Sequence, residues 1–465
     1  MSVTTELAAF ATGITLETLP PEVVERARFL VLDLIGNIVR ARAEAESTPA
    51  LLAGMRALGL GGGNASVFGD AARYTPLGAA LANATLGHSL DFDDTHAAGS
   101  LHPGVTAIAA ALAAGEMAGA NGAEVLAGIV AGYEVACRLA LALPAGEHYA
   151  RGFHPTATCG AFGAAAAAAR TFRLPPAAVQ SAFGIALSQT AGSLEFLVNG
   201  AWTKRFQVGW SAMSGLAAAS FAREGFKGAA EAFEGPHGFL RAYAPAARPA
   251  RATEELGKAF ELMATAVKPY PSCRFGHAGI DAVLALSAEH ALRPKEIEAV
   301  TLGLSKAGMT LIGRPVEKKA DPKNVVDGQF SGPFVLAVVL ATGGMGWDSY
   351  RLLDDPVVRS LLPKIRCEED AEIEAEFPSN MAGKVTIRAR GRVFQKTVRV
   401  PKGEPGNFLS EAELRGKFVS LAEPVLGAGQ TAALADAALA IAGLANISVL
   451  MRNGTPAAPA RLAGE

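Results

Sequence analysis

Histidines and aspartates gather in one short stretch of this 465-residue chain. GHSLDFDDTHAAGSLHPG covers residues 87–104, and three histidines and three aspartates lie within the seventeen residues from His88 to Gly104. Such groups move protons near neutral pH, because an ordinary imidazole has a pKa of about 6.5. They also bind transition metals. The stretch therefore indicates an acid–base site or a metal site, with a polar loop that caps helices as the structural alternative.

A calcium loop is excluded by position. His96 occupies the place of the required glycine, and His102 occupies the place of the closing glutamate. A zinc or manganese site stays open on residue types alone, because mixed carboxylate and imidazole sets bind these ions. A metal-dependent hydrolase is therefore a competing hypothesis, although acid–base use without a metal is favoured.

Two further candidates lie in the middle of the chain. His154 precedes Pro155 at the predicted start of a helix, and a helix N-terminus attracts carboxylates. Lys204 and Arg205 lie between apolar helices. This pair is either a solvated surface pair or a cationic clamp for a carboxylate. The spacing predicts His154 as an acid–base group and Lys204 as a catalytic and substrate-binding cation.

A third group lies in the proline- and glycine-rich segment KPYPSCRFGH, residues 268–277. It offers His277 together with the cations Lys268 and Arg274. The segment falls at a predicted domain boundary, where clefts tend to form. We predict that His277 is catalytic and that Lys268 and Arg274 bind a substrate carboxylate.

The chain offers neither a credible covalent nucleophile nor a cofactor loop. GWSAM at 209–213 lacks the second glycine of a nucleophile elbow. The glycine cluster at 59–63 follows a predicted helix and has Asn64 where a dinucleotide fingerprint needs glycine. What remains suits removal of a proton next to a carboxylate, with cations stabilising the enediolate.

The elements that position these groups are predicted to be mostly helices. Proline at a first turn, helical spacing of apolar residues and abundant alanine and glycine support this reading. Thr75 is a predicted N-cap ahead of Pro76. The predicted helices before residue 266 cover 21–43, 48–58, 76–90, 104–119, 122–142, 155–172, 176–194, 208–225 and 253–265.

The pattern changes after residue 268. A helix at 279–291 precedes an alternating strand from Ile297 to Leu304, and helices follow at 329–342 and 355–363. Residues 384–400 read as a hairpin that turns at Arg390-Gly391. Helices return from Ser410 and include 431–450, and the tail after Asn453 is expected to be loose.

These elements predict a mostly α protein with an inserted α+β domain. A large all-helical domain is built from both chain ends, residues 1–266 and 404–465, and a smaller, lid-like α+β domain covers 267–403. Two domains also fit the length, which exceeds what one hydrophobic core usually supports.

Composition limits the partners and the compartment. The net charge of −2 and the lack of a basic run argue against nucleic acid as a partner. The alanine-rich runs are too short to span a membrane, and the N-terminus has neither a basic nor an apolar leader region. A cytoplasmic protein is expected, because no CxxC pair occurs among the cysteines, Cys137, Cys159, Cys273 and Cys367.

Four motifs resemble the MmgE/PrpD family. They are GHSLDFDDTH (87–96) with HPG (102–104), GFHPTATCGAFGAAAAA (152–168), TKRFQVGWSAMSGLAAA (203–219) and KPYPSCRFGHAGIDAV (268–283). They occur in the family's order, and the likeness spans nearly the whole chain. The family contains 2-methylcitrate dehydratase, cis-aconitate decarboxylase and iminodisuccinate epimerase.

The resemblance implies the same helical domain and lid-like domain, a homodimer, no cofactor, and an active site in the cleft between domains. It implies a small di- or tricarboxylate substrate and a lyase reaction, most plausibly a dehydration like that of 2-methylcitrate dehydratase. The family's site residues correspond to Asp91, Thr95, His102, His154, Lys204 and His277.

Two departures keep the narrow activity open. The dehydratases carry asparagine and tryptophan where this chain has Asp93 and His96, with a longer insert before their HP motif. The decarboxylases use a tyrosine in the inserted domain, but this chain has none between Tyr270 and Tyr350. Epimerisation and decarboxylation therefore stay alternatives, as does a helical binding protein without activity. The sequence leaves open which histidine is acid and which is base.

Overall fold

The computed structural model describes residues 2–456, and these form two compact units. The first unit contains the residues up to 267 and those from 411 onwards, and the second contains residues 268–410. The second junction lies seven residues beyond the predicted one at 403/404, because Glu404 pairs with Arg274 inside the second unit. The mostly α fold with a small α+β part is confirmed. Beyond residue 456 the predicted loose tail lies outside the described residues.

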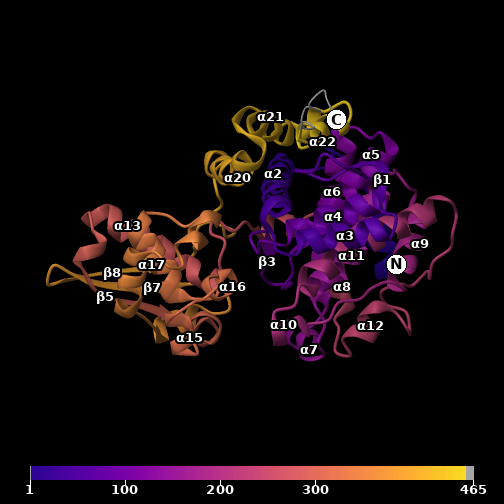
Figure 1. Ribbon diagram of the computed structural model, residues 1–465. Coiled ribbons are helices and arrows are strands. Elements are labelled where there is room, and N and C mark those ends of the chain that lie inside the picture. Colours follow the sequence, from indigo (N-terminus) through magenta and orange to yellow (C-terminus); the bar gives the residue numbers. More distant parts are fainter. Residues whose placement is uncertain (1, 457–465) are drawn as a thin grey trace, which may run out of the picture. The chain divides into compact units, whose positions relative to one another are not determined.

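The first unit is a bundle of helices contributed by both ends of the chain (Figure 1). Its helices are α1 (Val3–Gly13), α2 (Pro21–Glu44), α3 (Thr48–Ala57), α4 (Pro76–Gly87), α5 (Pro103–Ala118), α6 (Gly122–Ala142), α7 (Ala145–Ala150), α8 (Pro155–Thr171), α9 (Pro176–Leu187), α10 (Phe196–Asn199), α11 (Thr203–Arg223), α12 (Phe239–Tyr243), α20 (Glu411–Leu426), α21 (Ala428–Leu439) and α22 (Ser448–Asn453).

Small residues let the central helices α5, α6 and α8 approach closely. A Cβ added at Gly132 of α6 would lie 2.7 Å from the Cβ of Ala107 in α5 and 2.9 Å from the carbonyl oxygen of Gly163 in α8. A side chain at this crossing would push three backbones apart. Helix α6 is also the one described helix that is long and apolar enough to cross a membrane, but 94% of that window is buried inside the protein.

Several predicted helices are confirmed nearly to the residue, including α6 and α8, and Thr75 caps α4 by accepting from the Gly78 N–H. The prediction over 176–194 is wrong beyond Leu187, because the following segment pairs instead with the loop before His154. There the His154 N–H donates to the Gly192 carbonyl (3.1 Å), and the Leu194 N–H donates to the Gly152 carbonyl (2.8 Å).

Two other segments before residue 266 differ from the prediction of an all-helical domain. Residues 253–265 form no α-helix, because the guanidinium of Arg138 donates hydrogen bonds to the carbonyl oxygens of Glu254 (2.7 Å) and Ala259 (2.6 Å). The glycine cluster enters a short strand, β1 (Gly61–Ser66), which pairs antiparallel with β2 (Arg73–Tyr74). Helix α11 begins five residues earlier than predicted, which places Lys204 in its first turn.

The second unit contains a four-stranded sheet in the order β6-β5-β7-β8. Strands β5 and β6 are parallel and the other neighbours are antiparallel. The helix predicted over 329–342 is confirmed as α17, which begins three residues later, at Gly332. The bounds are β5 (Ile297–Leu304), β6 (Ile365–Glu369), β7 (Gly383–Ala389), β8 (Arg392–Val398), α13 (His277–His290), α14 (Lys306–Gly308), α15 (Val316–Ala320), α16 (Val325–Gln329), α17 (Gly332–Thr342), α18 (Pro356–Leu361) and α19 (Ala371–Glu376).

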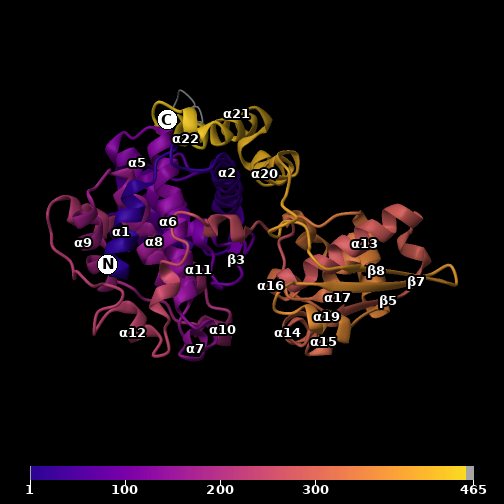
Figure 2. The same cartoon turned by 180° about the vertical axis from the view of Figure 1, so that it is seen from behind.

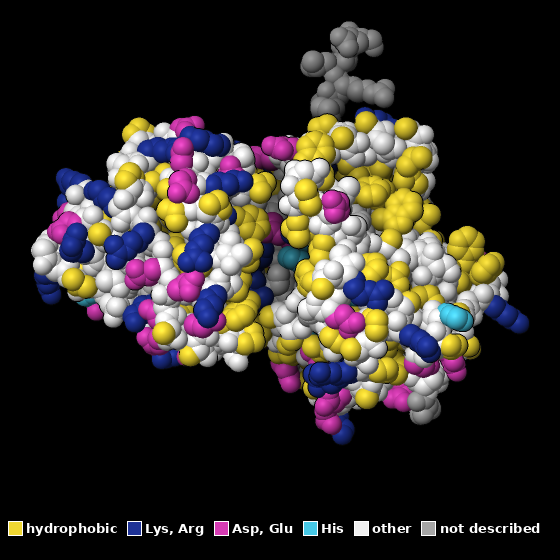
Figure 3. All heavy atoms as spheres, turned by 90° about the horizontal axis from the view of Figure 1, so that it is seen from below, with side chains coloured by type: hydrophobic (Ala, Val, Ile, Leu, Met, Phe, Trp, Pro, Cys, Tyr) yellow, Lys and Arg dark blue, Asp and Glu magenta, His cyan; other side chains and the backbone are white. Residues whose placement is uncertain are grey.

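The predicted hairpin is confirmed as β7 and β8, with Ala389 paired to Arg392 across the turn (Figure 2). Both turn residues, Arg390 and Gly391, have positive φ angles of 54° and 67°. Such a turn matches the natural twist of the strands. Helices α13 and α17 pack on the sheet, and Figure 3 shows many lysine and arginine side chains on one surface of this unit.

Candidate active site

Two of the predicted site histidines begin helices in the same way. His102 is the N-cap of α5 and His154 is the N-cap of α8, and each is followed by proline. Proline disfavours a helical conformation in the residue before it, so both histidines are extended, with ψ angles of 89° and 106°. The His102 N–H also donates to Thr156 Oγ1 (3.1 Å), which joins the starts of α5 and α8.

A third imidazole joins these two. His88 is the C-cap of α4, and its ring centroid lies 4.6 Å from that of His102 and 6.1 Å from that of His154. Three helix ends thus bring three imidazoles into one cluster. His88 and His154 are almost completely buried, whereas the side chain of His102 is 15% exposed.

Asp93 holds this cluster together. Its Oδ2 accepts a hydrogen bond from His88 Nδ1 (2.7 Å) and lies 3.1 Å from His102 Nδ1, an ion-pair contact rather than a well-aligned hydrogen bond. The side chain of Asp93 has no exposed surface. The sequence placed Asp93 in the right stretch but did not predict it as a site residue, because adjacent aspartates in a loop look alike.

The geometry of His88, Asp93 and His102 favours hydrogen bonding over metal binding. Their ligand atoms lie within 4.8 Å of one another, as a metal site requires. However, two ligands on a tetrahedral zinc ion, each about 2.0–2.1 Å from it, lie about 3.3 Å apart. His88 Nδ1 and Asp93 Oδ2 are only 2.7 Å apart. His102 Nδ1 also lies only 3.1 Å from this oxygen, again closer than two ligands of one tetrahedral zinc ion.

Burial and charge set the protonation states in the cluster. Burial lowers the pKa of His88 to about 4, so this imidazole is neutral at pH 7. Burial alone would raise the pKa of Asp93, but His102 and His88 hold it well below its usual value. Asp93 is therefore an ionised carboxylate that contacts the imidazoles of both His88 and His102.

His154 is held by a residue that the sequence did not predict. Gln207 Nε2 lies 2.8 Å from His154 Nδ1, and Gln207 Oε1 accepts from the Ser193 N–H (2.9 Å). Burial, with a smaller contribution from His88, lowers the pKa of His154 well below its usual value. Gln207 lies one helical turn after Lys204 on α11, and this spacing could have indicated it.

Asp91 and Lys204 form an ion pair beside the imidazoles. Lys204 Nζ lies 2.7 Å from Asp91 Oδ1, and both side chains are partly exposed. Burial alone would lower the pKa of Lys204, but Asp91 raises it above its usual value. Asp91 has a positive φ of 53°, a conformation that is costly outside glycine and that collects at functional sites. Lys204 is therefore a firmly protonated cation.

The other members of the opening stretch have different surroundings. Thr95 and His96 form β3, which pairs with β4 (Thr265–Ala266). Thr95 Oγ1 is buried and has no hydrogen-bond partner among the described residues, so it suits the predicted role of binding a substrate oxygen. His96 bonds to Glu261 (3.0 Å) and accepts from the Gly99 N–H, which gives it a structural role.

The C-terminal segment supports the site loop through a lysine that sequence reasoning missed. Lys417 of α20 lies 2.5 Å from Asp33 of α2, and both side chains are buried. Its ammonium also donates to the carbonyl of Phe92 (2.8 Å) and lies 3.7 Å from the centroid of that ring. Phe92 stands between Asp91 and Asp93, so this contact fixes the loop that carries both.

Asp94 is a buried carboxyl with an unusual pKa. Tyr133 O–H donates to its Oδ2 (2.5 Å) and the Gly104 N–H donates to its Oδ1 (3.2 Å). Burial raises the pKa of Asp94 to about 7, well above the value of about 3.9 in an unfolded chain. Between these values the folded protein binds more protons than the unfolded chain, so Asp94 makes stability fall as pH rises from about 4 to 7.

Asp94→Asn is therefore expected to flatten the pH dependence of the free energy of unfolding between pH 5 and 8. Asparagine keeps an acceptor and never ionises, so the variant gains stability relative to the wild type at the upper end of this window. Urea unfolding at several pH values measures it, with the exposed Asp436→Asn as the control. Equal slopes for wild type and Asp94→Asn would show that Asp94 does not titrate there.

The three predicted site residues of the second unit lie close together in its chain. His277 begins α13, and its Nε2 donates to the Ser272 carbonyl (3.2 Å). Lys268 is buried. Arg274 forms a two-pronged pair with Glu404, with Nε 2.9 Å from Oε1. A substrate carboxylate on Arg274 would compete with Glu404, so the binding role of Arg274 stays a prediction, as do those of the other two.

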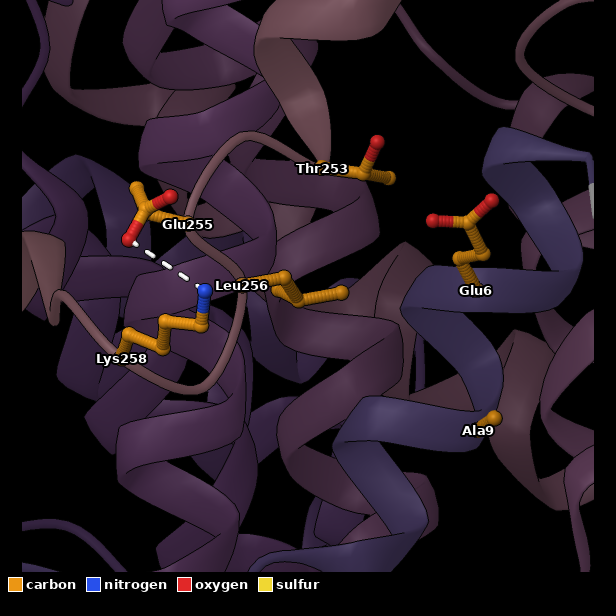
Figure 4. A pocket seen from close by; sticks show the side chains of 6 residues that line it. All are labelled: Glu6, Ala9, Thr253, Glu255, Leu256 and Lys258. Atoms are coloured by element: carbon orange, nitrogen blue, oxygen red, sulfur yellow. Dashed lines mark ion pairs between the residues drawn. The ribbon is translucent and has the colours of Figure 1, made fainter.

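A surface hollow of the first unit contains none of the predicted site residues (Figure 4). Glu6 and Ala9 of α1 line one side of it, and the loop with Thr253 and Leu256 lines the other. Glu255 and Lys258 pair with each other at 3.8 Å. The hollow offers neither imidazoles nor an unpaired cation, so the imidazole cluster remains the candidate active site.

Comparisons with known proteins find matches along most of the chain. The sequence model of the MmgE/PrpD N-terminal domain matches residues 5–252, and that of the MmgE/PrpD C-terminal domain matches residues 270–441. A cis-aconitate decarboxylase-like protein, oryM, of Aspergillus oryzae is 27% identical over 97% of this chain and 96% of its own length.

Two other relatives carry the name cis-aconitate decarboxylase. The Aspergillus terreus protein is 25% identical over 97% of this chain and 95% of its own. The Homo sapiens protein is 26% identical over 91% of this chain and 89% of its own. The likeness thus extends through both units.

Proposed function

Because the chain belongs to the MmgE/PrpD family, an enzyme family with lyases that act on carboxylates, we propose that it is a cofactor-independent lyase for a small di- or tricarboxylate. It removes the proton next to a carboxylate, and the reaction is a dehydration of the 2-methylcitrate dehydratase type. The observation that carries this proposal is the cluster of His88, His102 and His154 around Asp93, with the Lys204 ammonium beside it.

Protonation states support proton abstraction as the first step. His88 and His154 have lowered pKa values because they are buried, so they are neutral at pH 7. A neutral imidazole can accept a proton or donate a hydrogen bond. Lys204, whose pKa is raised by Asp91, supplies a positive charge for a substrate carboxylate and for the enediolate that forms from it.

Decarboxylation is the second candidate, and the names of the relatives favour it. Release of carbon dioxide also needs a carbanion stabilised by cations, so the same site can serve it. The chain has no tyrosine between Tyr270 and Tyr350, where the decarboxylases use one. We place dehydration first for this reason, although Asp93 and His96 also depart from the dehydratases.

A panel of carboxylates in deuterated water tests the proposal. Incubation with 2-methylcitrate, cis-aconitate and iminodisuccinate is expected to give a conjugated double bond by ultraviolet absorption with the first acid, without carbon dioxide. Carbon dioxide from cis-aconitate would support decarboxylation instead. Deuterium incorporation without loss of water or carbon dioxide would indicate an epimerase. No signal from any acid would reject the enzyme proposal.

The panel also decides about a metal. Turnover is expected to survive exhaustive chelation, because the proposed chemistry uses only side chains. Loss of turnover on chelation, restored by zinc or manganese alone, would support the metal-dependent hypothesis. His277, Lys268 and Arg274 are proposed to contribute from the second unit, and variants at these positions belong in the same assay.

A homodimer in the cytoplasm completes the proposal. Large apolar side chains recur on α11 and its N-cap at helical spacing and are between 41% and 57% exposed: Trp202, Phe206, Trp210 and Phe221. Exposed apolar rows of this kind commonly mark protein interfaces. Light scattering of the purified chain measures its mass and tests the dimer, and a monomer would reject it.

A further inference from the structure

We infer that Asp93 and Gln207 hold His102 and His154 in opposite tautomers, which makes His102 the proton acceptor and His154 a neutral hydrogen-bond donor. The tautomer of His154 follows from its hydrogen-bond partner, and that of His102 follows from the charged oxygen beside its Nδ1. The two roles rest on the proposed function. Asp93 and Gln207 act as positioning residues, because each works through the imidazole that it touches.

The tautomer of His154 follows from the orientation of the Gln207 amide. A backbone N–H can only donate, so the atom that faces the Ser193 N–H at 2.9 Å must be the amide oxygen of Gln207. Its nitrogen then donates to the Ser193 carbonyl (3.2 Å) and to His154 Nδ1 (2.8 Å). Because Nδ1 accepts, the single proton of the neutral imidazole lies on Nε2.

The tautomer of His102 follows from the carboxylate beside it. The Asp93 carboxylate is ionised, and a lone pair on a ring nitrogen 3.1 Å from its Oδ2 would be repelled by that oxygen, so Nδ1 of His102 carries a hydrogen. When the ring of His102 holds a single proton, its lone pair is therefore on Nε2. His88 has the same tautomer, since its Nδ1 donates to the same oxygen, but its side chain is fully buried, whereas that of His102 is 15% exposed. His102 is thus the imidazole that presents a lone pair to a ligand.

These tautomers divide the work of a dehydration. The proton next to the carboxylate moves to His102 Nε2, and its electron pair enters the enediolate. The carbon–oxygen bond then breaks as the double bond forms, and the leaving hydroxide takes the proton from His102 as water. Asp93 stabilises the imidazolium in between. The step balances without another reactant.

His154 suits a different part of the same step. Loss of its Nε2 proton would leave an imidazolate, which is far too basic to form readily, so the ring donates a hydrogen bond rather than a proton. A neutral imidazole at a helix N-terminus is an effective partner for a developing enediolate oxygen. His154 is the N-cap of α8, which provides that setting.

Nuclear magnetic resonance of protein labelled with nitrogen-15 in histidine tests the tautomers without substrate. Spectra are recorded near pH 8, above the ordinary histidine pKa of about 6.5. Each ring is assigned from the signals lost in His88→Gln, His102→Gln or His154→Gln. We expect a hydrogen on Nε2 of His154 and on Nδ1 of His102. A hydrogen on Nδ1 of His154, or on Nε2 of His102, would overturn the inference.

Two variants connect the tautomers to turnover. Gln207→Glu places a carboxylate at His154 Nδ1 and is expected to move the hydrogen there. Asp93→Asn is expected to move the His102 hydrogen to Nε2. Each should lower kcat on the order of 10²–10⁴-fold with a small change in KM. The exposed Gln395→Glu and Asp436→Asn make the same chemical changes as controls and should leave both constants unchanged.

The outcomes separate the inference from the proposed function. The expected wild-type tautomers with no turnover on any acid would leave the inference standing and reject the lyase. Turnover in a protein with unexpected tautomers would support the lyase and reject the inference. A variant whose tautomer changes while kcat stays within about threefold of wild type would overturn the assigned roles. If a variant fails to fold, the wild-type spectrum still decides the tautomers.

Discussion

His102→Gln is expected to lower kcat by roughly 10²–10⁴-fold, the range that a positioned general base contributes. Glutamine has a similar reach but no basic nitrogen, so the proton next to the substrate carboxylate has no acceptor. KM should change much less, because the Lys204 ammonium and the Thr95 hydroxyl that are proposed to bind the substrate remain. Initial rates on the acid that the wild type turns over measure both constants.

The exposed His237→Gln is the matched control, since it makes the same substitution away from the cluster. Circular dichroism and the urea midpoint should show that His102→Gln keeps its fold, because the neighbouring Asp93 retains the His88 hydrogen bond (2.7 Å). Turnover within about threefold of wild type in the folded variant would reject His102 as the base.

Lys417→Met is expected to lower the free energy of unfolding of the helical unit by about 3–5 kcal/mol, the usual cost of breaking a buried ion pair on one side. Methionine fills much of the space but leaves Asp33 buried without its ammonium partner. The loss of the hydrogen bond to the Phe92 carbonyl should also loosen the loop that carries Asp91 and Asp93. Urea unfolding and KM measure the two effects.

The pH dependence of the Lys417→Met effect gives its cause. Burial raises the pKa of Asp33 even with Lys417 present, and removal of the ammonium raises it further. Above pH 4 this carboxyl is ionised in the unfolded chain but still protonated in the folded variant, which favours unfolding. The stability lost in Lys417→Met should therefore grow as pH rises above about 4. Arg415→Met on the same helix removes an exposed pair and should cost at most about 1 kcal/mol. Equal losses would refute the buried-pair explanation.

The sequence predicted most of what depends on neighbours in the chain. Pro155 marked the start of α8 and so placed His154 at its N-cap, and α5 begins at Pro103, one residue before its predicted start. The Arg390-Gly391 dipeptide located the hairpin turn. These signals act within a few residues, where steric limits and capping decide the conformation.

What the sequence did not predict depends on partners far away in the chain. Lys417 reaches Asp33 from 384 residues away, and no local pattern marks either of them. The apolar residues of 253–265 recur at helical spacing, but the buried Arg138 donates hydrogen bonds to two backbone carbonyls of this segment. The roles proposed for the two histidines depend on whether Asp93 or Gln207 contacts each ring, which spacing cannot tell. Tertiary contacts decided each of these cases.

The helical unit is built from both ends of the chain, so during synthesis it can be completed only after the second unit has been made. Asp33, the imidazoles and Lys204 leave the ribosome before residue 267, but the ammonium of Lys417 follows only after the 143 residues of the second unit, 268–410. At about 5–20 residues per second this delay lasts roughly 7–30 s. During that time Asp33 lacks its lysine, and the Asp91–Asp93 loop lacks the hydrogen bond from Lys417 to the Phe92 carbonyl. A nascent chain that stalls inside the second unit therefore carries the proposed catalytic side chains without this contact.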